Sequence, residues 1–200
     1  MPKYFRYFPE VKHQGFIGKN ITRRVRFTDT IANDPYIFLP YTIKEGEKAE
    51  DIANFYYGDV NKVWLVWMSA NVIDPYFDWP MIQSNLDAYI IDKYRTEAEE
   101  YYGRSATDQE VLNFTRNATI TENIHHYYDV NDEDVLISPE TYAINATDTP
   151  LDPDFTASNW VAMRYYDYEF IQNENKRHIT LVDRKYAEQM QKELKSVLNV

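Results

Sequence analysis

Two adjacent histidines, His125 and His126, are by residue type the side chains of this 200-residue chain best suited to bind a metal ion. They lie in residues 119–130, a stretch rich in β-branched and aromatic residues that predicts a strand. Adjacent residues of a regular strand point to opposite faces of the sheet, so both rings cannot easily reach one ion. The other two histidines, His13 and His178, lie in unrelated sequence contexts. We therefore predict no metal site.

Pairs of carboxylates are the second pattern that could do chemistry, because a glycoside hydrolase works with two of them at a defined separation. Nothing in the sequence selects one pair, and solvated acidic residues are expected in so acidic a chain. The chain also lacks the HExxH, glycine-rich phosphate-loop and GxSxG motifs. We predict that the protein is not an enzyme and has no catalytic residues and no cofactor. The pairs considered are Glu45 and Glu47, Asp74 and Asp78, and Glu99 and Glu100, with Asp74 expected to form a cap or turn before Pro75.

Three tryptophans could contact a sugar, since sugar rings stack on aromatic faces. They are Trp64, Trp67 and Trp79. Trp64 shares a predicted helical face with Val63 and Met68, which favours a place in the core. For Trp67 and Trp79, core packing and contact with a partner are both open interpretations.

These tryptophans belong to residues 41–80, which predict one compact supersecondary unit. Gly46 interrupts an initial strand because glycine tolerates positive φ, and Gly58 is placed to end a helix as a left-handed cap. Pro75 disfavours helical backbone in the residue before it, so the chain is expected to extend or turn there. The predicted elements are a strand at 41–44, a helix over 49–56, a second helix over 63–71 and a return strand near 72–76.

This pattern resembles the LysM module. The resemblance implies a βααβ fold and binding of the N-acetylglucosamine polymers of cell walls. Such a pattern is more specific for the fold than for the ligand. The matching residues are Tyr41, Ile43, Lys44, Gly46, Ile52, Ala53, Tyr57, Gly58, Trp64, Asn71 and Ile73.

A wider set of residues resembles the LysM-like baseplate wedge subunit of contractile-tailed bacteriophages. The match is discontinuous, is weak over residues 97–158 and includes no motif in residues 1–40. It adds Met68, Asp74, Pro75, Tyr76, Trp79, Tyr89, Lys93, Tyr94, Tyr168, Glu169, Asn173, Glu174, Lys176, Arg177 and Ile179. The resemblance implies a structural protein of the virion tail baseplate, present in multiple copies with sixfold symmetry and assembled in the host cytoplasm. Its partners would be other baseplate wedge proteins and tail-hub or sheath-initiating proteins.

The charge of the chain limits its other partners. With 21 basic and 32 acidic residues, the net charge of -11 opposes binding to nucleic acid or to an anionic membrane and favours partners with basic surfaces. The absence of cysteine excludes disulfides and thiolate metal sites. No apolar run reaches the about 18 residues that a membrane span needs, and no signal peptide is recognised. The 18 tyrosines favour extensive protein contact, with a tyrosine-edged, β-rich core as the alternative.

Residues 1–40 predict an extended N-terminal arm. Its aromatic residues are broken by Pro9, Gly15 and Gly18, and residues 20–28 predict a strand. The segment is too apolar for a free tail and too broken for a domain, so we expect it to become ordered on a partner. A strand packed on its own lobe is the alternative. An arm that binds a partner implies that deleting residues 1–40 leaves a folded protein that no longer enters baseplates.

The remaining chain predicts helices first and a small sheet later. Pro80 suits a helix start, Gly103 a helix end, and Thr107 with Glu110 a capping box. Residues 160–170 fit both strand and helix. The expected elements are helices over 82–95, extendable to 102, and after 107; strands at 119–130, 135–137, 142–144 and 179–182; a loop over 147–158; a turn over 173–177; and a final helix capped by Asp183 with a stripe of Tyr186, Met190, Leu194 and Val197.

The sequence as a whole predicts an α+β protein. We expect an extended N-terminal arm at 1–40, a LysM-like βααβ module at 41–80, a helical connector at 81–117, and a mixed α+β region with a small antiparallel sheet and a C-terminal helix at 118–200. The favoured function is a structural component of a phage tail baseplate wedge that joins neighbouring wedges into the ring around the tail hub. Two alternatives are a LysM-type module that binds peptidoglycan or N-acetylglucosamine, and a wall hydrolase that uses a carboxylate pair.

Overall fold

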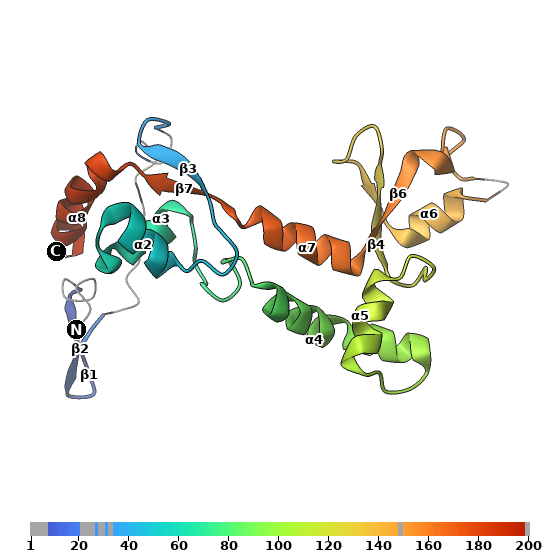
Figure 1. Cartoon of the computed structure of the whole chain (residues 1–200), viewed down its shortest axis with the longest axis horizontal. Helices are drawn as coiled ribbons and strands as arrows, with labels where there is room; N and C mark the ends of the chain where they lie inside the picture. The colour runs from blue at the N-terminus through green and yellow to red at the C-terminus, as the bar shows by residue number, and fades with distance from the viewer. Residues whose placement is uncertain (1–7, 21–26, 28–30, 32–33, 148–149, 199–200) are drawn as a thin grey trace. The chain divides into compact units, whose positions relative to one another are not determined.

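A computed structural model of the chain describes residues 8–20, 27, 31, 34–147 and 150–198 (Figure 1). The chain divides into two compact units. Unit 1 contains residues 1–80 and 176–200, and unit 2 contains residues 81–175. Unit 2 is therefore continuous in sequence and is inserted between two segments that fold together as unit 1.

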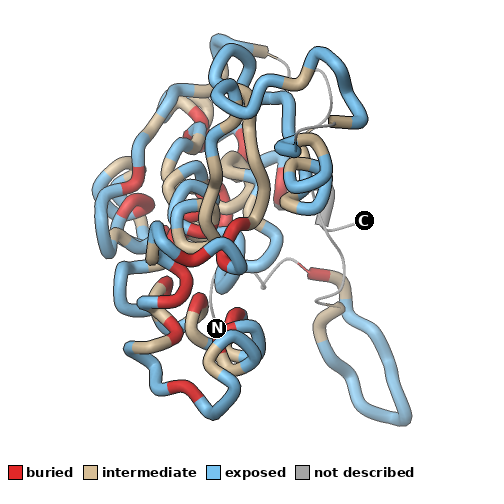
Figure 2. The backbone as a smooth tube through the Cα atoms, turned by 90° about the vertical axis from the view of Figure 1, so that its right-hand side faces the viewer, coloured by how far each residue is buried: buried red, intermediate tan, exposed pale blue. Residues whose placement is uncertain are grey.

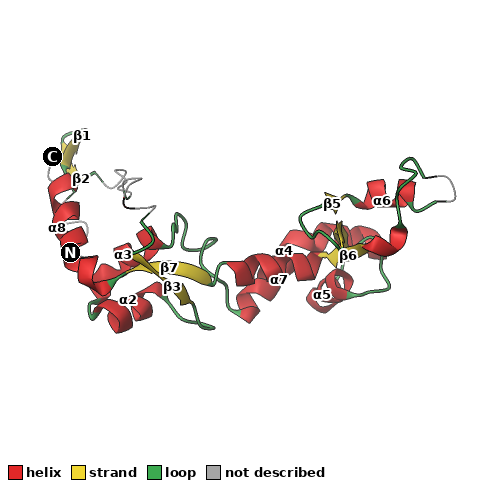
Figure 3. Ribbon diagram, turned by 90° about the horizontal axis from the view of Figure 1, so that it is seen from above, coloured by secondary structure: helices red, strands yellow, loops and turns green. Residues whose placement is uncertain are grey.

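Unit 1 combines short strands with helices. Strands β1 and β2 form an antiparallel hairpin, and β3 pairs antiparallel with β7 with Tyr41 opposite Ile179. Figure 3 shows β3 and β7 side by side, next to α2 and α3. The elements are β1 (Glu10–His13), β2 (Phe16–Lys19), β3 (Phe38–Thr42), α2 (Ala49–Tyr57), the 3-10 helix η2 (Val60–Lys62), α3 (Val63–Ser69), β7 (His178–Val182) and α8 (Arg184–Leu198).

The strand–helix–helix order predicted within residues 41–80 is confirmed, but the return strand predicted near 72–76 is wrong. The Asp74 carbonyl oxygen accepts hydrogen bonds from the amides of Phe77 and Asp78, at 3.1 and 2.8 Å, which closes a turn. Pro75 lacks the amide proton that a paired strand needs. The strand that pairs with β3 is β7, which follows unit 2 in the sequence.

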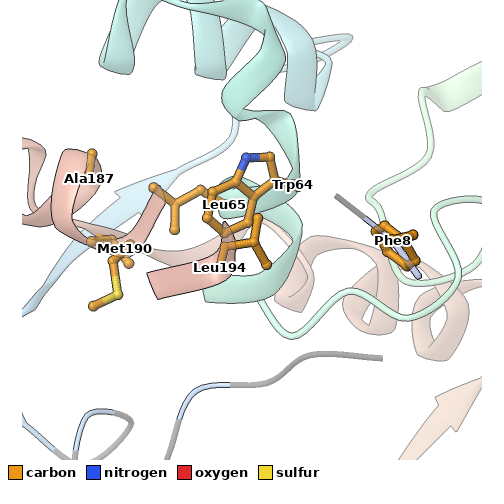
Figure 4. Close-up of a cluster of buried hydrophobic side chains, with 7 residues drawn as sticks. Phe8, Trp64, Leu65, Ala187, Met190 and Leu194 are labelled. Atoms are coloured by element: carbon orange, nitrogen blue, oxygen red, sulfur yellow. The ribbon is translucent and has the colours of Figure 1, made fainter. Parts of the chain in front are cut away.

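Two clusters of buried apolar side chains stabilise unit 1. The first lies between β3, α2, α3 and β7 and contains Ile43, Ala49, Ile52, Ala53, Val66 and Leu181. The second, shown in Figure 4, joins α3 and β7 to α8 and contains Phe8, Trp64, Leu65, Val182, Ala187, Met190 and Leu194. Met190 and Leu194 thus pack in the core, as the stripe predicts for the final helix. Residues 176–200, which the sequence groups with 118–175, therefore belong to unit 1 because β7 and α8 complete its core.

The described part of the N-terminal segment has one buried anchor and one exposed hairpin. Phe8 is 2% exposed and lies in the second cluster. The hairpin β1–β2 turns at Gln14 and Gly15, whose φ angles of 48° and 86° are those that two-residue hairpin turns favour. Seven of its eight strand residues are exposed, and Figure 2 shows the hairpin largely in the colour of exposed residues. The strand predicted over 20–28 lies outside the described residues, apart from Asn20 and Phe27.

Unit 2 packs helices against a small antiparallel sheet with strand order β5-β4-β6, so the predicted α+β class and the small sheet are confirmed. None of its described helices, nor any described helix of unit 1, is long and apolar enough to cross a membrane. The elements are α4 (Gln83–Tyr102), α5 (Asp108–Arg116), β4 (Ile124–Asp129), β5 (Leu136–Ile137), α6 (Pro139–Asn145), the 3-10 helix η3 (Ala157–Asn159), β6 (Trp160–Arg164) and α7 (Tyr165–Asn175).

Some helix ends in unit 2 follow local sequence signals, but the helix start predicted at Pro80 is wrong, because α4 begins at Gln83 after the N-cap Ile82. Helix α4 ends at Gly103, whose φ of 64° is the expected left-handed cap, and the capping box of Thr107 and Glu110 begins α5. The strand predicted at 142–144 is wrong, because Ser138 accepts a hydrogen bond from the Thr141 amide and the following proline begins α6. The ambiguous residues 160–170 divide into β6 and the start of α7, which continues through part of the turn predicted at 173–177.

Candidate protein-interaction surface

The carboxylates Glu45 and Glu47 take part in the local structure of unit 1. Glu47 accepts hydrogen bonds from the Tyr41 hydroxyl at 2.8 Å and from the Lys44 amide at 3.0 Å. Burial, together with this carboxylate, raises the pKa of Tyr41 to about 12. Glu45 forms an ion pair with Arg177. The Glu47 contacts hold the loop after β3 on that strand, and the ion pair connects the loop to Arg177, the residue that precedes β7.

Asp74 and Asp78 instead fix the backbone of the loop after α3. The Asp78 carboxylate accepts hydrogen bonds from the amides of Asp74 and Ile73, at 2.8 Å each, and these bonds lower its pKa. The Asp74 carboxylate accepts a hydrogen bond from the Tyr76 amide at 2.9 Å, so the cap or turn expected at this residue is confirmed. In unit 2, Glu99 accepts a hydrogen bond from the Ala106 amide at 3.3 Å.

The same loop presents three large apolar side chains to solvent. Ile73, Tyr76 and Phe77 are 62%, 85% and 58% exposed, and we call this set the aromatic loop. The ammonium of Lys176 donates a hydrogen bond to the Phe77 carbonyl oxygen at 2.6 Å, which adds a fourth tie to the loop backbone. Exposed aromatic residues on an ordered backbone are typical of protein-binding sites, because less conformational entropy is lost on binding.

The tryptophans of unit 1 pack inward. Trp64 is 7% exposed in the second cluster, which confirms its predicted core position. Trp67 and Trp79 are half-buried against the first cluster, and the Trp79 indole donates a hydrogen bond to the Glu47 carbonyl oxygen at 3.0 Å. Of the two interpretations left open for these two rings, the structure therefore shows core packing.

The prediction that His125 and His126 point to opposite faces is wrong. A β-bulge between Ile124 and His126 breaks the alternation of β4, and the two Nδ1 atoms lie 2.7 Å apart. Tyr168 of α7 stacks on His125 with ring centroids 3.8 Å apart and meets His126 edge-on. Burial lowers the pKa of both rings, and the neighbouring His126 lowers that of His125 further. Among the residues that the structure describes, no three His, Cys, Asp or Glu side chains are grouped to hold a metal ion.

Several residues that carry the baseplate wedge resemblance contact one another inside unit 2. The Glu169 carboxylate, 7% exposed, accepts hydrogen bonds from the Lys93 ammonium at 2.6 Å and from the Tyr94 hydroxyl at 2.8 Å. Burial and this carboxylate raise the pKa of Tyr94. The Asn173 amide forms two hydrogen bonds with the backbone of Met81, at 2.7 and 3.0 Å. These contacts tie α7 to α4 and to the residue where the chain enters unit 2.

Sequence reasoning did not single out the aromatic loop as a binding surface, although Asp74-Pro75 marks it as a turn. Of its three exposed residues, Tyr76 belongs to the set that carries the wedge resemblance, and Ile73 belongs to the LysM set. No curated protein matches the chain. The family model for Base plate wedge protein 53 matches residues 17–195 and thus spans the aromatic loop and nearly all described elements of both units. The chain therefore belongs to the family of base plate wedge protein 53, structural proteins of the phage tail baseplate.

Proposed function

We propose that this protein joins neighbouring wedges into the ring around the tail hub, with each unit holding a different neighbour. A linker between subunits needs two separate binding surfaces, and a repeated contact of this kind closes a cyclic assembly. The division into two units with separate cores supports this role. Exposed large apolar side chains occur on both units, for example Tyr76 in unit 1 and Leu151 in unit 2, at 85% and 79% exposure.

The observation that carries the proposal is the aromatic loop of unit 1. Its three side chains stay exposed although the chain has an apolar core available, and its backbone is fixed by Asp74, Asp78 and Lys176. Burying a large apolar side chain is worth about 1.5–3 kcal/mol, so Tyr76 and Phe77 together are enough to anchor a protein interface.

We also propose that β3, α2, α3 and β7 form the LysM-like part of the protein, with unit 2 inserted before its last strand. The order of these elements and the antiparallel pairing of β3 with β7 support this interpretation. In this interpretation the LysM-like part contacts other proteins of a contractile tail. The partners would be other wedge proteins and tail-hub or sheath-initiating proteins, in a sixfold baseplate assembled in the host cytoplasm.

The exposed hairpin β1–β2 is the part of the arm that we propose to contact a neighbour. Phe16 and Ile17 are 80% and 63% exposed. Deleting residues 1–40 is not a clean test, because it also removes the buried Phe8 and the first residues of β3. Replacing Phe16 and Ile17 with serine tests the hairpin without removing core residues.

Co-expression with each of the other wedge proteins of the same phage, followed by size-exclusion chromatography and measurement of Kd, tests the role. The wild-type chain should co-elute with at least one of them. The double variant Tyr76→Ser/Phe77→Ser should bind at least about 30-fold more weakly, since two buried aromatic anchors are lost. Phe55→Ser is a matched control, because Phe55 is 76% exposed on α2 of the same unit.

A second variant tests the ordering of the loop backbone separately from the contribution of its aromatic side chains. Asp78→Ala keeps every aromatic side chain but removes the acceptor for the amides of Ile73 and Asp74. It should weaken binding less than the double serine variant, because only the ordering of the loop is lost. If the double serine variant binds every wedge protein as tightly as the wild type, the aromatic loop is not the docking surface.

A further inference from the structure

The charge of this chain is concentrated in one part of unit 2. Residues 117–163 contain nine acidic residues and no lysine or arginine, so they account for nine of the eleven net negative charges. Neither flanking arginine is described in an ion pair with a carboxylate of this segment: Arg116 pairs with Asp87, and Arg164 donates hydrogen bonds to the backbone carbonyls of Asn117 and Ala118. The acidic segment comprises the strands β4 and β5, helix α6 and most of β6.

Helix α6 covers one face of the sheet in this segment, and α7 reaches the other face at His126, where Tyr168 meets that ring. In an antiparallel pair, directly opposite residues project to the same side. Tyr127 is opposite Ile137 on one neighbour and Ala162 on the other, so these three share a face. Helix α6 lies on that face, where Tyr142 stacks on Tyr127 with ring centroids 3.8 Å apart.

The other face carries an apolar row with one residue from each strand. Tyr128 is opposite Leu136 of β5 and Val161 of β6. Leu136 is 55% exposed and Val161 is 38% exposed, while Tyr128 is half-buried. We call this row the open sheet face. Exposure of this apolar row to water is unfavourable, and its three residues are too few to form a core of their own.

Carboxylates border the open sheet face at the turn between β4 and β5. Asp132, Glu133 and Asp134 are all exposed in this turn. Val130 and Val135, which flank them, are 56% and 45% exposed. In the part of the chain that the structure describes, no ion pair involves any of these three carboxylates. An apolar row bordered by unneutralised negative charge is complementary to an apolar patch bordered by lysine and arginine.

We infer that the open sheet face, with its acidic border, docks on a basic protein surface of another baseplate subunit. This inference rests on the proposed function and names the kind of partner that unit 2 takes. The apolar row would supply affinity, while the carboxylates would steer association and select the partner. A second copy of this chain is a poor occupant, because each copy would bring the same negative charge to the contact. Nucleic acids and anionic membranes are excluded for the same reason.

Association kinetics of the full-length protein with the other wedge proteins of the phage, at low and at high salt, test the inference. The triple variant Asp132→Asn/Glu133→Gln/Asp134→Asn should lower the association rate about tenfold at low salt and much less at high salt, because salt screens the charges. Asp92→Asn/Glu97→Gln/Glu100→Gln is the matched control. It neutralises three exposed carboxylates on α4 of the same unit and should leave the rate unchanged.

The apolar row is tested separately by Leu136→Ser, which should raise the dissociation rate about tenfold, and by Leu136→Met, which should restore it. Circular dichroism confirms that the serine variant is folded. An association rate of the triple variant equal to that of its control, or self-association of the wild type through this face, would overturn the inference while leaving the proposed function intact. Failure of the wild type to bind any baseplate protein would overturn both.

Discussion

The pairing of β3 with β7 predicts that Leu181→Ala destabilises unit 1 and leaves unit 2 folded. Leu181 is 1% exposed and packs in the cluster that contains Ile43, Ile52 and Val66. Truncating a fully buried leucine costs about 2–5 kcal/mol, because the transfer free energy of the removed atoms is lost and a cavity is left. For a unit of roughly 100 residues, each kcal/mol lowers the Tm by about 4–8 °C. The Tm of unit 1 should therefore fall by roughly 8–40 °C.

Tryptophan fluorescence can follow the two units separately. Trp64, Trp67 and Trp79 lie in unit 1, and the fourth tryptophan, Trp160, lies in unit 2. In a Trp160→Phe background, fluorescence during heating reports on unit 1 alone. Hydrogen exchange measured by mass spectrometry then shows which strands lose protection.

Leu151→Ala is the matched control for this experiment. Leu151 is 79% exposed in unit 2, so its truncation should change the free energy of unfolding by less than about 0.5 kcal/mol. Leu181→Ala should expose the amides of β3 and β7 while those of β4 and β6 stay protected. An unchanged Tm, or loss of protection in unit 2 before unit 1, would refute the reasoning that β7 completes the core of unit 1.

Three further predictions concern single contacts. The pKa values of His125 and His126 are lowered in the folded chain, so the unfolded chain binds more protons and the free energy of unfolding should fall as the pH drops below about 6.5. Replacing both histidines with glutamine should make the free energy of unfolding, measured in urea, depend less on pH. An unaltered pH dependence would contradict this prediction. Glu169→Ala should lower the free energy of unfolding, measured by chemical denaturation, by about 1–3 kcal/mol, since the buried Tyr94 hydroxyl loses its acceptor. An unchanged free energy of unfolding would mean that water replaces the carboxylate. Gly58→Ala should lower the free energy of unfolding by about 1–2 kcal/mol, because the φ of 68° is strained for alanine. No steric clash should add to this strain, since no atom lies within 4 Å of the added Cβ. A higher free energy of unfolding would contradict this reasoning.

Signals confined to a few neighbouring residues predicted structure well in this chain. Gly103 ends α4, and the capping box of Thr107 and Glu110 begins α5, because each acts on backbone groups within one turn. Asp183 likewise accepts a hydrogen bond from the Lys185 amide at the start of α8. In each case the whole interaction lies within a few neighbouring residues, so the residue types and their spacing are enough to predict it.

Pairing between distant strands could not be predicted in this way. The strand at 179–182 is visible in the sequence, but nothing local indicates that it pairs with β3 across the whole of unit 2. The nearer candidate at 72–76 looked suitable because it follows the second helix directly. Its backbone donors are bonded to Asp74 and Asp78 instead, so the segment turns.

Sequence reasoning about the histidines and the exposed aromatic residues failed for a related reason. The alternation rule for His125 and His126 assumes a regular strand, and the bulge that breaks it depends on the register with β6. Nothing in the residue types of Tyr76 and Phe77 marks them as exposed, since large apolar side chains are usually buried. The turn that Pro75 forces leaves them exposed, and that turn is the local signal that could have identified the surface.

Assembly of baseplates by a phage that lacks this protein, with variants supplied from a plasmid, tests the central claim most directly. Wild-type protein and Phe55→Ser should restore infectious particles with complete baseplates in electron micrographs, whereas Tyr76→Ser/Phe77→Ser should yield folded protein but incomplete baseplates. Complete baseplates formed with the double variant, or normal infectious tails formed without the protein, would contradict the claim that it works by docking its neighbours.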